Sequence, residues 1–176
     1  MAIRPIVLYP DPVLLRPTQP VGQVDEEVRQ LVRDMTETLY AAPGIGLAAN
    51  QVGVSQRVCI VDLTAGEEND SLRVLINPVV KATEGAELGE EGCLSFPDVT
   101  IEVVRPFRAT VEALDVEGRP ITVTAEGLLA RVILHEIEHL EGQVFLRNLS
   151  SLKRERIKQQ IRKRIKTGDW VATAAL

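Results

Sequence analysis

The stretch GLLARVILHEIEHLEG, residues 127–142, contains both histidines of a chain of 176 residues. His135 and His139 are four residues apart, and on a helix that spacing places two side chains on one face. Two imidazoles arranged in this way can bind one metal cation, and Glu136 can reach the same point from the side as a general base. The stretch therefore predicts a metal-binding helix over about residues 126–140, ended by Gly142.

The same helix is predicted to be buried on nearly all sides. Leu128 and Val132 share the face of the histidines, so an apolar surface would lie beside the cation. Other apolar residues occupy the remaining faces: Leu129, Ile133, Ile137 and Leu140. Buried histidines need polar partners, which a metal supplies. The alternative is that HExxH arose by chance and both histidines are ordinary core or surface residues.

The third metal ligand has to come from elsewhere in the chain, because a catalytic site of this kind has three protein ligands and one open position. No third histidine exists. Glu141 is too close on the same helix end, and Glu155 is embedded in a basic segment. Cys59 is flanked by aliphatic residues and has the pattern of a small core residue. We favour Cys93, because its segment EEGCLSFP (90–97) contains a glycine and can present a thiolate.

Length and composition indicate a single globular domain over residues 1–176. The chain is 45% hydrophobic and 26% charged, which is ordinary for such a protein. No apolar run approaches the roughly 20 residues that span a bilayer, and prolines interrupt the N-terminal segment where a signal peptide would need an apolar run. With two cysteines, we expect a cytoplasmic protein without disulfides, and no membrane partner.

Charge is distributed unevenly along the chain. Residues 151–166 contain eight basic residues and one acid, a net charge of +7, so the chain's total of −5 leaves −12 for the rest. The segment predicts a basic C-terminal helix with an apolar stripe of Leu152, Ile157, Ile161 and Ile165. The simpler interpretation is a solvated amphipathic helix, and the sharper one is a helix that docks on ribosomal RNA. A binding module with a structural metal is a further alternative, although the acidic body argues against general nucleic-acid binding.

The remaining pattern predicts an α+β fold with antiparallel β-sheets around the central HExxH helix, plus N-terminal and C-terminal helices. Asp25 is a good N-cap for a helix over about 25–41, which ends before Pro43 and Gly44. Glycines in segments 44–53 and 84–98 indicate loops. The predicted strands cover residues 57–63, 73–80, 100–104, 109–116 and 120–125.

The segment GIGLAA (44–49) also matches the dinucleotide-binding pattern GxGxxA. That pattern binds a pyrophosphate only where it follows a strand and opens a helix. Here it follows a predicted helix and precedes a predicted strand, so we expect no dinucleotide partner.

Three segments resemble, in order, the three motifs of peptide deformylases: GIGLAANQ (44–51), EGCLS (91–95) and HEIEHLEG (135–142). The opening YPDPVLL (9–15) and the ending LSSLKRERIKQQIRKRIK (149–166) resemble the bacterial members that end in a helix, so the likeness covers essentially the whole chain. The family usually has Asp at the position of Glu138 and Gln at the position of Leu134. The first departure keeps an acid, whereas the second changes the hydrogen bonding around the metal.

This resemblance implies an enzyme that hydrolyses the N-formyl group from the N-terminal formyl-methionine of newly made polypeptides and releases formate. It implies one divalent metal per chain, Fe(II) in the native enzyme, with Zn, Ni or Co able to substitute. The implied ligands and catalytic groups are Cys93, His135 and His139 for the metal, Glu136 as general base, and the Gln51 amide and Leu94 backbone N–H as donors to the oxyanion.

The resemblance also implies how the substrate binds. Its backbone would pair with Ile45 or Gly46 as an added strand. Its methionine side chain would enter an apolar pocket lined by Leu128, Val132 and the stem of Arg131. Ordinary core packing is the alternative for Leu128 and Val132.

The segment around the cysteine is expected to complete the substrate site with Glu91 and Gly92. An ion pair between Glu91 and Arg105 would brace this segment, and the alternative is two solvated surface charges. A metalloprotease would use the same metal, water and glutamate, so only the pocket and the third ligand distinguish it from a deformylase.

Overall fold

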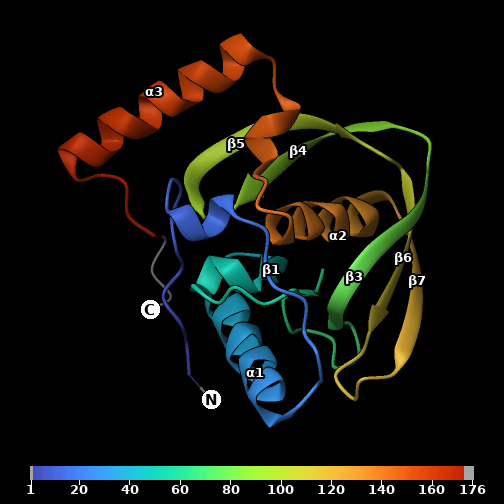
Figure 1. Cartoon of the computed structure of the whole chain (residues 1–176). Helices are drawn as coiled ribbons and strands as arrows, with labels where there is room; N and C mark the ends of the chain where they lie inside the picture. Colours follow the sequence, from blue (N-terminus) through green and yellow to red (C-terminus); the bar gives the residue numbers. More distant parts are fainter. Residues whose placement is uncertain (1, 173–176) are drawn as a thin grey trace.

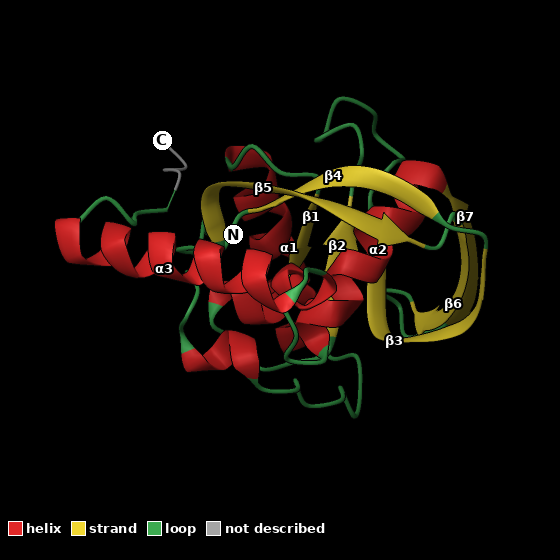
Figure 2. Ribbon diagram, turned by 90° about the horizontal axis from the view of Figure 1, so that it is seen from above, coloured by secondary structure: helices red, strands yellow, loops and turns green. Residues whose placement is uncertain are grey.

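A central helix surrounded by antiparallel strands organises the protein, whose computed structural model describes residues 2–172. This helix, α2 (Gly127–Leu140), carries both histidines. One side packs on a five-stranded sheet, and the β4–β5 hairpin crosses its other side (Figures 1 and 2). The predicted α+β fold with antiparallel sheets is therefore confirmed.

The five-stranded sheet has the order β1-β2-β3-β6-β7, and every neighbouring pair is antiparallel. Its strands are β1 (Gly46–Ala48), β2 (Val58–Val61), β3 (Arg73–Glu84), β6 (Arg108–Leu114) and β7 (Pro120–Glu126). The hairpin consists of β4 (Glu87–Cys93) and β5 (Phe96–Arg105). Strand β1 forms one edge of the large sheet, next to α2.

Two segments predicted to be loops contain regular structure instead. Residues 84–98 form most of the β4–β5 hairpin, and residues 44–53 contain β1 and the 3-10 helix η2 (Ala49–Val52). Gly46 belongs to a strand because β1 and α2 approach each other closely at this residue. A Cβ there would lie 2.5 Å from Glu136 Oε1 and 2.7 Å from Val132 Cγ1. Glycine in this strand therefore marks the contact of β1 with α2 and does not mark a break in the strand.

Helix α1 (Glu26–Ala41) follows the predicted boundaries and packs beside β1 and β2. Its N-cap Asp25 accepts a hydrogen bond from the Val28 backbone N–H at 3.0 Å, which stabilises the first turn by about 1 kcal/mol. Met35 and Leu39 are completely buried on its inner face. Each such side chain contributes about 1.5–3 kcal/mol through burial.

Helix α3 (Ser151–Thr167) lies along the side of the body (Figures 1 and 2). Ile161 of this helix is buried against the body, but Leu152 is 67% exposed and Ile165 is 45% exposed. The body therefore covers only part of the apolar stripe predicted for this helix. The other short helices are the 3-10 turns η1 (Pro12–Leu15) and η3 (Phe145–Asn148). Between residues 2 and 172, no helix is both long enough and apolar enough to cross a lipid bilayer.

Candidate metal centre

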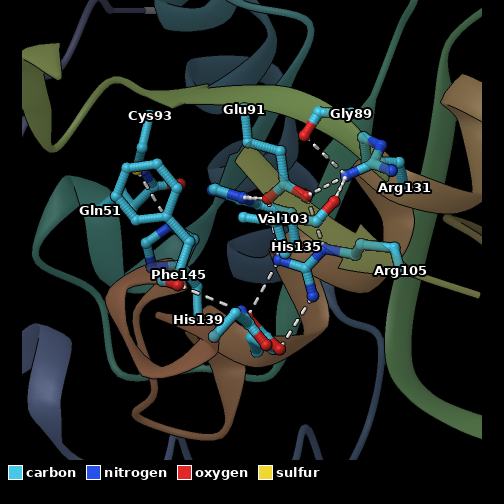
Figure 3. A network of polar contacts seen from close by, with 12 residues as sticks. Gln51, Gly89, Glu91, Cys93, Val103, Arg105, Arg131, His135, His139 and Phe145 are labelled. Carbon is cyan, nitrogen blue, oxygen red and sulfur yellow. Dashed lines mark hydrogen bonds and ion pairs between the residues drawn. The ribbon is translucent and has the colours of Figure 1, made fainter. Parts of the chain in front are cut away.

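Two distant parts of the sequence bring potential metal-binding atoms together. Cys93 lies at the end of β4, and His135 and His139 lie on one face of α2. One ligand atom from each lies within 4.8 Å of the other two. Cys93 Sγ is 3.2 Å from His139 Nε2, and the centres of the two imidazole rings are 5.0 Å apart (Figure 3). A thiol and two imidazoles in this arrangement suit a first-row divalent cation.

The surroundings of His135 favour positive charge. Its Nδ1 lies 2.8 Å from Glu91 Oε1, which leaves Nε2 as the free ring nitrogen. Burial lowers the pKa of His135, but hydrogen bonds with Cys93 and Glu91 outweigh burial and raise this pKa well above its usual value. The space between the ring and the thiol can therefore hold a proton or a cation.

His139, the second candidate ligand on α2, is held in its neutral form. Burial, followed by the nearby charge of His135, lowers the pKa of His139 well below its usual value. Neutral imidazole is the form that binds a metal. Asn50, on η2, donates a hydrogen bond of 2.6 Å to the backbone oxygen of His139 and so ties α2 to the GIGLAANQ segment. The three donor atoms therefore fit a metal ion, and a cation bound there would displace the proton that His135 holds.

Glu91 forms the centre of a buried charged network beside the candidate ligands (Figure 3). Its carboxylate accepts hydrogen bonds from Arg105 at 2.7 and 2.8 Å and from Arg131 at 2.9 Å, besides the one with His135. Burial alone would raise the pKa of Glu91, but the bonds from Arg105 and His135 lower it to about 2. The predicted ion pair between Glu91 and Arg105 is present, and Arg105 also pairs with Glu138 at 2.8 Å. The alternative of two solvated charges is wrong.

Glu136 follows His135 on α2 and also lines the cavity, but its surroundings are very different. Its side chain is buried, and its Oε2 has no hydrogen-bond partner among the described residues. Burial raises the pKa of Glu136 to about 7, although the charge of His135 acts in the opposite direction. A carboxylate of this kind can take up and release a proton near neutral pH.

Gln51 presents its amide nitrogen toward the thiol. Its Oε1 accepts a hydrogen bond from the Ala48 backbone N–H at 2.9 Å, so its Nε2 points to Ser95 Oγ at 3.1 Å and to Cys93 Sγ at 3.5 Å. Ser95 and Asn50 were not predicted as site residues. The available signal was their position, since each is a buried polar residue within two residues of Gln51 or Cys93.

The other candidates for a third ligand lie elsewhere. Cys59 is fully buried in the apolar cluster of the large sheet, and burial raises its pKa well above the usual value. Its predicted role as a core residue is confirmed. Glu141 is half exposed near Arg57, and Glu155 pairs with Arg162 on the surface of α3.

A cavity of about 640 Å³ opens onto these groups. Every predicted site residue except His139 lines it, as the set Ile45, Gly46, Gln51, Glu91, Gly92, Cys93, Leu94, Leu128, Arg131, Val132, His135 and Glu136. Leu128 is 52% exposed, which excludes the alternative of core packing, whereas Val132 is buried and also belongs to the core. Leu134 packs in the same apolar cluster.

The chain is similar to several known proteins. A family model described as polypeptide deformylase matches residues 3–155. A peptide deformylase of Acidobacterium capsulatum is 48% identical over 170 residues, which cover 97% of this chain and 100% of that protein. A crystal structure of a peptide deformylase from Legionella pneumophila has a TM-score of 0.88 at 40% identity and covers 95% of this chain and 98% of that one. A peptide deformylase from Ehrlichia chaffeensis in complex with actinonin has a TM-score of 0.85 at 37% identity, with coverage of 93% and 98%.

Proposed function

The chain belongs to the peptide deformylase family, and from that membership we propose that it removes the N-formyl group from the N-terminal formyl-methionine of newly made polypeptides. The products are formate and a free amino terminus, and the reaction takes place in the cytoplasm, where these chains begin. The observation that carries the proposal is the convergence of Cys93, His135 and His139 within 4.8 Å, beside a cavity lined by Glu136, whose Oε2 has no hydrogen-bond partner in residues 2–172.

Cys93, His135 and His139 are the proposed ligands of one divalent metal ion per chain. Three protein donors leave one coordination position open, as catalytic sites require. Fe(II) is the expected native ion, with Zn, Ni or Co able to substitute, because a His₂Cys donor set accepts several first-row ions. When bound, the cation supplies Lewis-acid activation of water and of the substrate carbonyl.

Glu136 is the proposed general base and acid. Its free Oε2 takes a proton from the attacking water while the new C–O bond forms at the formyl carbon. The same carboxyl then gives a proton to the amine nitrogen as the C–N bond breaks. The raised pKa of Glu136, about 7, suits a group that must both accept and donate a proton near neutral pH.

Gln51 and Leu94 are the proposed donors to the oxyanion that forms on the formyl oxygen. The Gln51 amide is oriented in advance, because Ala48 holds its oxygen and Ser95 holds one side of its nitrogen. The Leu94 backbone N–H lies in the turn of the β4–β5 hairpin, beside Cys93. Fixed donors of this kind each lower the barrier by about 3–4 kcal/mol in well-studied enzymes.

The edge of β1 and the apolar part of the cavity are the proposed binding surfaces for the peptide. Ile45 and Gly46 line the cavity at the open side of this edge strand, where an extended peptide can add as a further strand. Leu128, Val132 and the stem of Arg131 would surround the methionine side chain. Glu91 and Gly92 close the cavity on the side of β4.

Release of formate from a formyl-Met peptide tests the proposal directly. The metal-loaded protein should release formate from this peptide, and it should leave an acetyl-Met peptide of the same sequence intact. Cys93→Ser should remove the activity together with tight metal binding. A metalloprotease would instead cleave internal bonds of unformylated peptides, and that result would reject a deformylase.

We also propose that α3 docks the enzyme on the ribosome through its basic surface. The helix contacts the body through Ile161 and through Arg164, which donates to the Pro97 backbone oxygen at 2.8 Å. Most of its basic side chains are exposed. Sedimentation with ribosomes should show binding that falls steeply between about 50 and 200 mM salt. Salt-independent binding, or none at low salt, would reject this role.

A further inference from the structure

Arg131 has a buried guanidinium that connects α2 to the β4–β5 hairpin. The residue is 5% exposed, although arginine is rarely buried without partners. Its Nη2 donates a hydrogen bond to the Glu87 backbone oxygen at 2.7 Å, and its Nη1 donates to the Val103 backbone oxygen at 2.8 Å. These oxygens belong to the two different strands of the hairpin, Glu87 to β4 and Val103 to β5. The rigid fork of the guanidinium therefore holds both strands against α2.

The guanidinium occupies space that a side chain at position 89 would otherwise fill. A Cβ built on Gly89 would lie 2.9 Å from Arg131 Cζ and 3.0 Å from Nε and Nη2. Those distances are too short for any side chain to coexist with the arginine in this position. Gly89 and Arg131 are therefore a matched pair, in which the missing side chain of one makes room for the other.

The same guanidinium contacts the carboxylate that holds a proposed metal ligand. Arg131 Nη1 donates to Glu91 Oε2 at 2.9 Å, and Glu91 Oε1 lies 2.8 Å from His135 Nδ1. We propose that Arg131, seated on Gly89, is a positioning residue that fixes Glu91 and through it the ring of His135 for metal binding. This inference rests on the proposed metal site, and it assigns Arg131 a role besides lining the methionine pocket.

Two guanidinium groups hold Glu91 in different ways. Arg105 binds both carboxylate oxygens and comes from β5, whereas Arg131 comes from α2, one helical turn before His135. Of these two guanidinium groups, therefore, only that of Arg131 comes from the helix that carries the histidines. Partners of this kind around a metal ligand typically change metal affinity by about 10–100-fold when they are removed.

Zinc affinity of the folded protein is the measurement that tests the inference. Competition with a chromophoric chelator should give an about 10–100-fold weaker Zn(II) affinity for Arg131→Met, which keeps the stem and removes the fork. Arg131→Lys should also be weakened, because an ammonium group cannot reach both strands and Glu91 at once. The control is Arg108→Met, since Arg108 is a half-exposed arginine that lies 3.7 Å from Glu126. It should bind zinc as the wild type does.

A role in stability alone would give a different result. In that case Arg131→Met would lower the melting temperature and leave the zinc affinity of the folded protein unchanged, which would overturn the inference. If Arg131→Met does not fold, Gly89→Ala provides a second test. It keeps the arginine but displaces the guanidinium, so it should weaken zinc binding in the same direction. Unchanged zinc affinity in a folded Gly89→Ala protein would also overturn the inference.

The double variant tests whether the two positions act as one. Gly89→Ala should cause no further loss of zinc affinity in the Arg131→Met background, because the displaced group is already absent. Additive losses would reject the pairing. These measurements do not depend on formate release. A protein with this zinc pattern but no deformylase activity would reject the proposed function and keep the role of Arg131.

Discussion

Two buried glutamates that line the cavity, Glu91 and Glu136, have opposite surroundings. Glu91, on β4, accepts hydrogen bonds from two arginines and a histidine, whereas Oε2 of Glu136, on α2, has no partner among the described residues. Their pKa values differ accordingly, at about 2 for Glu91 and about 7 for Glu136. Both residues are buried, and the hydrogen bonds that only Glu91 receives separate their charge states. One carboxylate is fixed in its ionised form, and the other is free to exchange a proton.

The largest effect on activity should come from removing the carboxylate of Glu136. Glu136→Gln keeps the shape of the side chain but cannot accept the proton of water, so kcat/KM for a formyl-Met peptide should fall by about 10²–10⁴-fold. Zinc affinity and the circular dichroism spectrum should stay at wild-type values, because Glu136 braces no neighbour. Activity equal to the wild type would show that another group accepts the proton.

Removing the carboxylate of Glu91, which is fixed in its ionised form, should mainly reduce the stability of the fold. Glu91→Ala leaves the buried guanidinium groups of Arg105 and Arg131 without their shared anion, and the free energy of unfolding should fall by about 3–5 kcal/mol. Urea unfolding at neutral pH measures the change. Glu90→Ala is the matched control, since Glu90 is exposed on the other face of the same strand. It should stay within about 0.5 kcal/mol of the wild type.

The two glutamates should also give opposite slopes of stability against pH in the metal-free protein. The lowered pKa of Glu91 stabilises the fold above about 4.5, and this contribution is lost as the pH falls toward about 2. The raised pKa of Glu136 means that the folded state holds a proton that the unfolded chain has released. Stability should therefore decrease as the pH rises from about 4.5 to about 7, by up to about 1.4 kcal/mol per pH unit.

Urea unfolding between pH 3 and pH 8 checks these slopes with two variants. Glu91→Gln should flatten only the acidic interval, and Glu136→Gln only the interval that approaches neutrality. If either variant leaves its own interval unchanged, the corresponding carboxyl does not have the altered pKa.

The smallest effect should come from removing Ser95 Oγ, an uncharged hydrogen-bond partner of the Gln51 amide. Ser95→Ala removes one hydrogen bond from the Gln51 amide, a loss of about 0.5–1.5 kcal/mol. This corresponds to a decrease in kcat of about 2–10-fold with little change in KM, because the amide is needed only once the oxyanion forms. Steady-state kinetics with a formyl-Met peptide measures it. A rise in KM alone would place Ser95 in substrate binding.

The helices and the grouping of the site residues could be predicted because their signals are local. The N-cap Asp25 and the apolar spacing after it define α1, and the i, i+4 spacing of His135 and His139 places both rings on one face. Cys93 was predicted from the chemistry of its segment, and the structure places its sulfur beside those rings. Whether these residues bind a metal stays a prediction.

The β4–β5 hairpin and the role of the Arg131 guanidinium could not be predicted in the same way. The glycines in residues 84–98 indicate a loop when only neighbours in sequence are considered, yet Gly89 is small because a distant arginine occupies its side-chain space. The acceptors of Arg131 on Glu87 and Val103 are backbone oxygens, which every residue possesses and no motif marks. Leu152 and Ile165 fit a helical stripe, but the body of the protein does not extend far enough to cover them.

The shortness of β1 limits how much of a bound chain the protein can read. The strand covers only Gly46–Ala48, and Glu136 and Val132 prevent any larger residue at Gly46. Main-chain pairing along so short an edge engages the first few residues of a peptide and leaves everything downstream untouched. Such an enzyme would accept many different proteins as substrates, because the sequence beyond their first few residues would not affect binding.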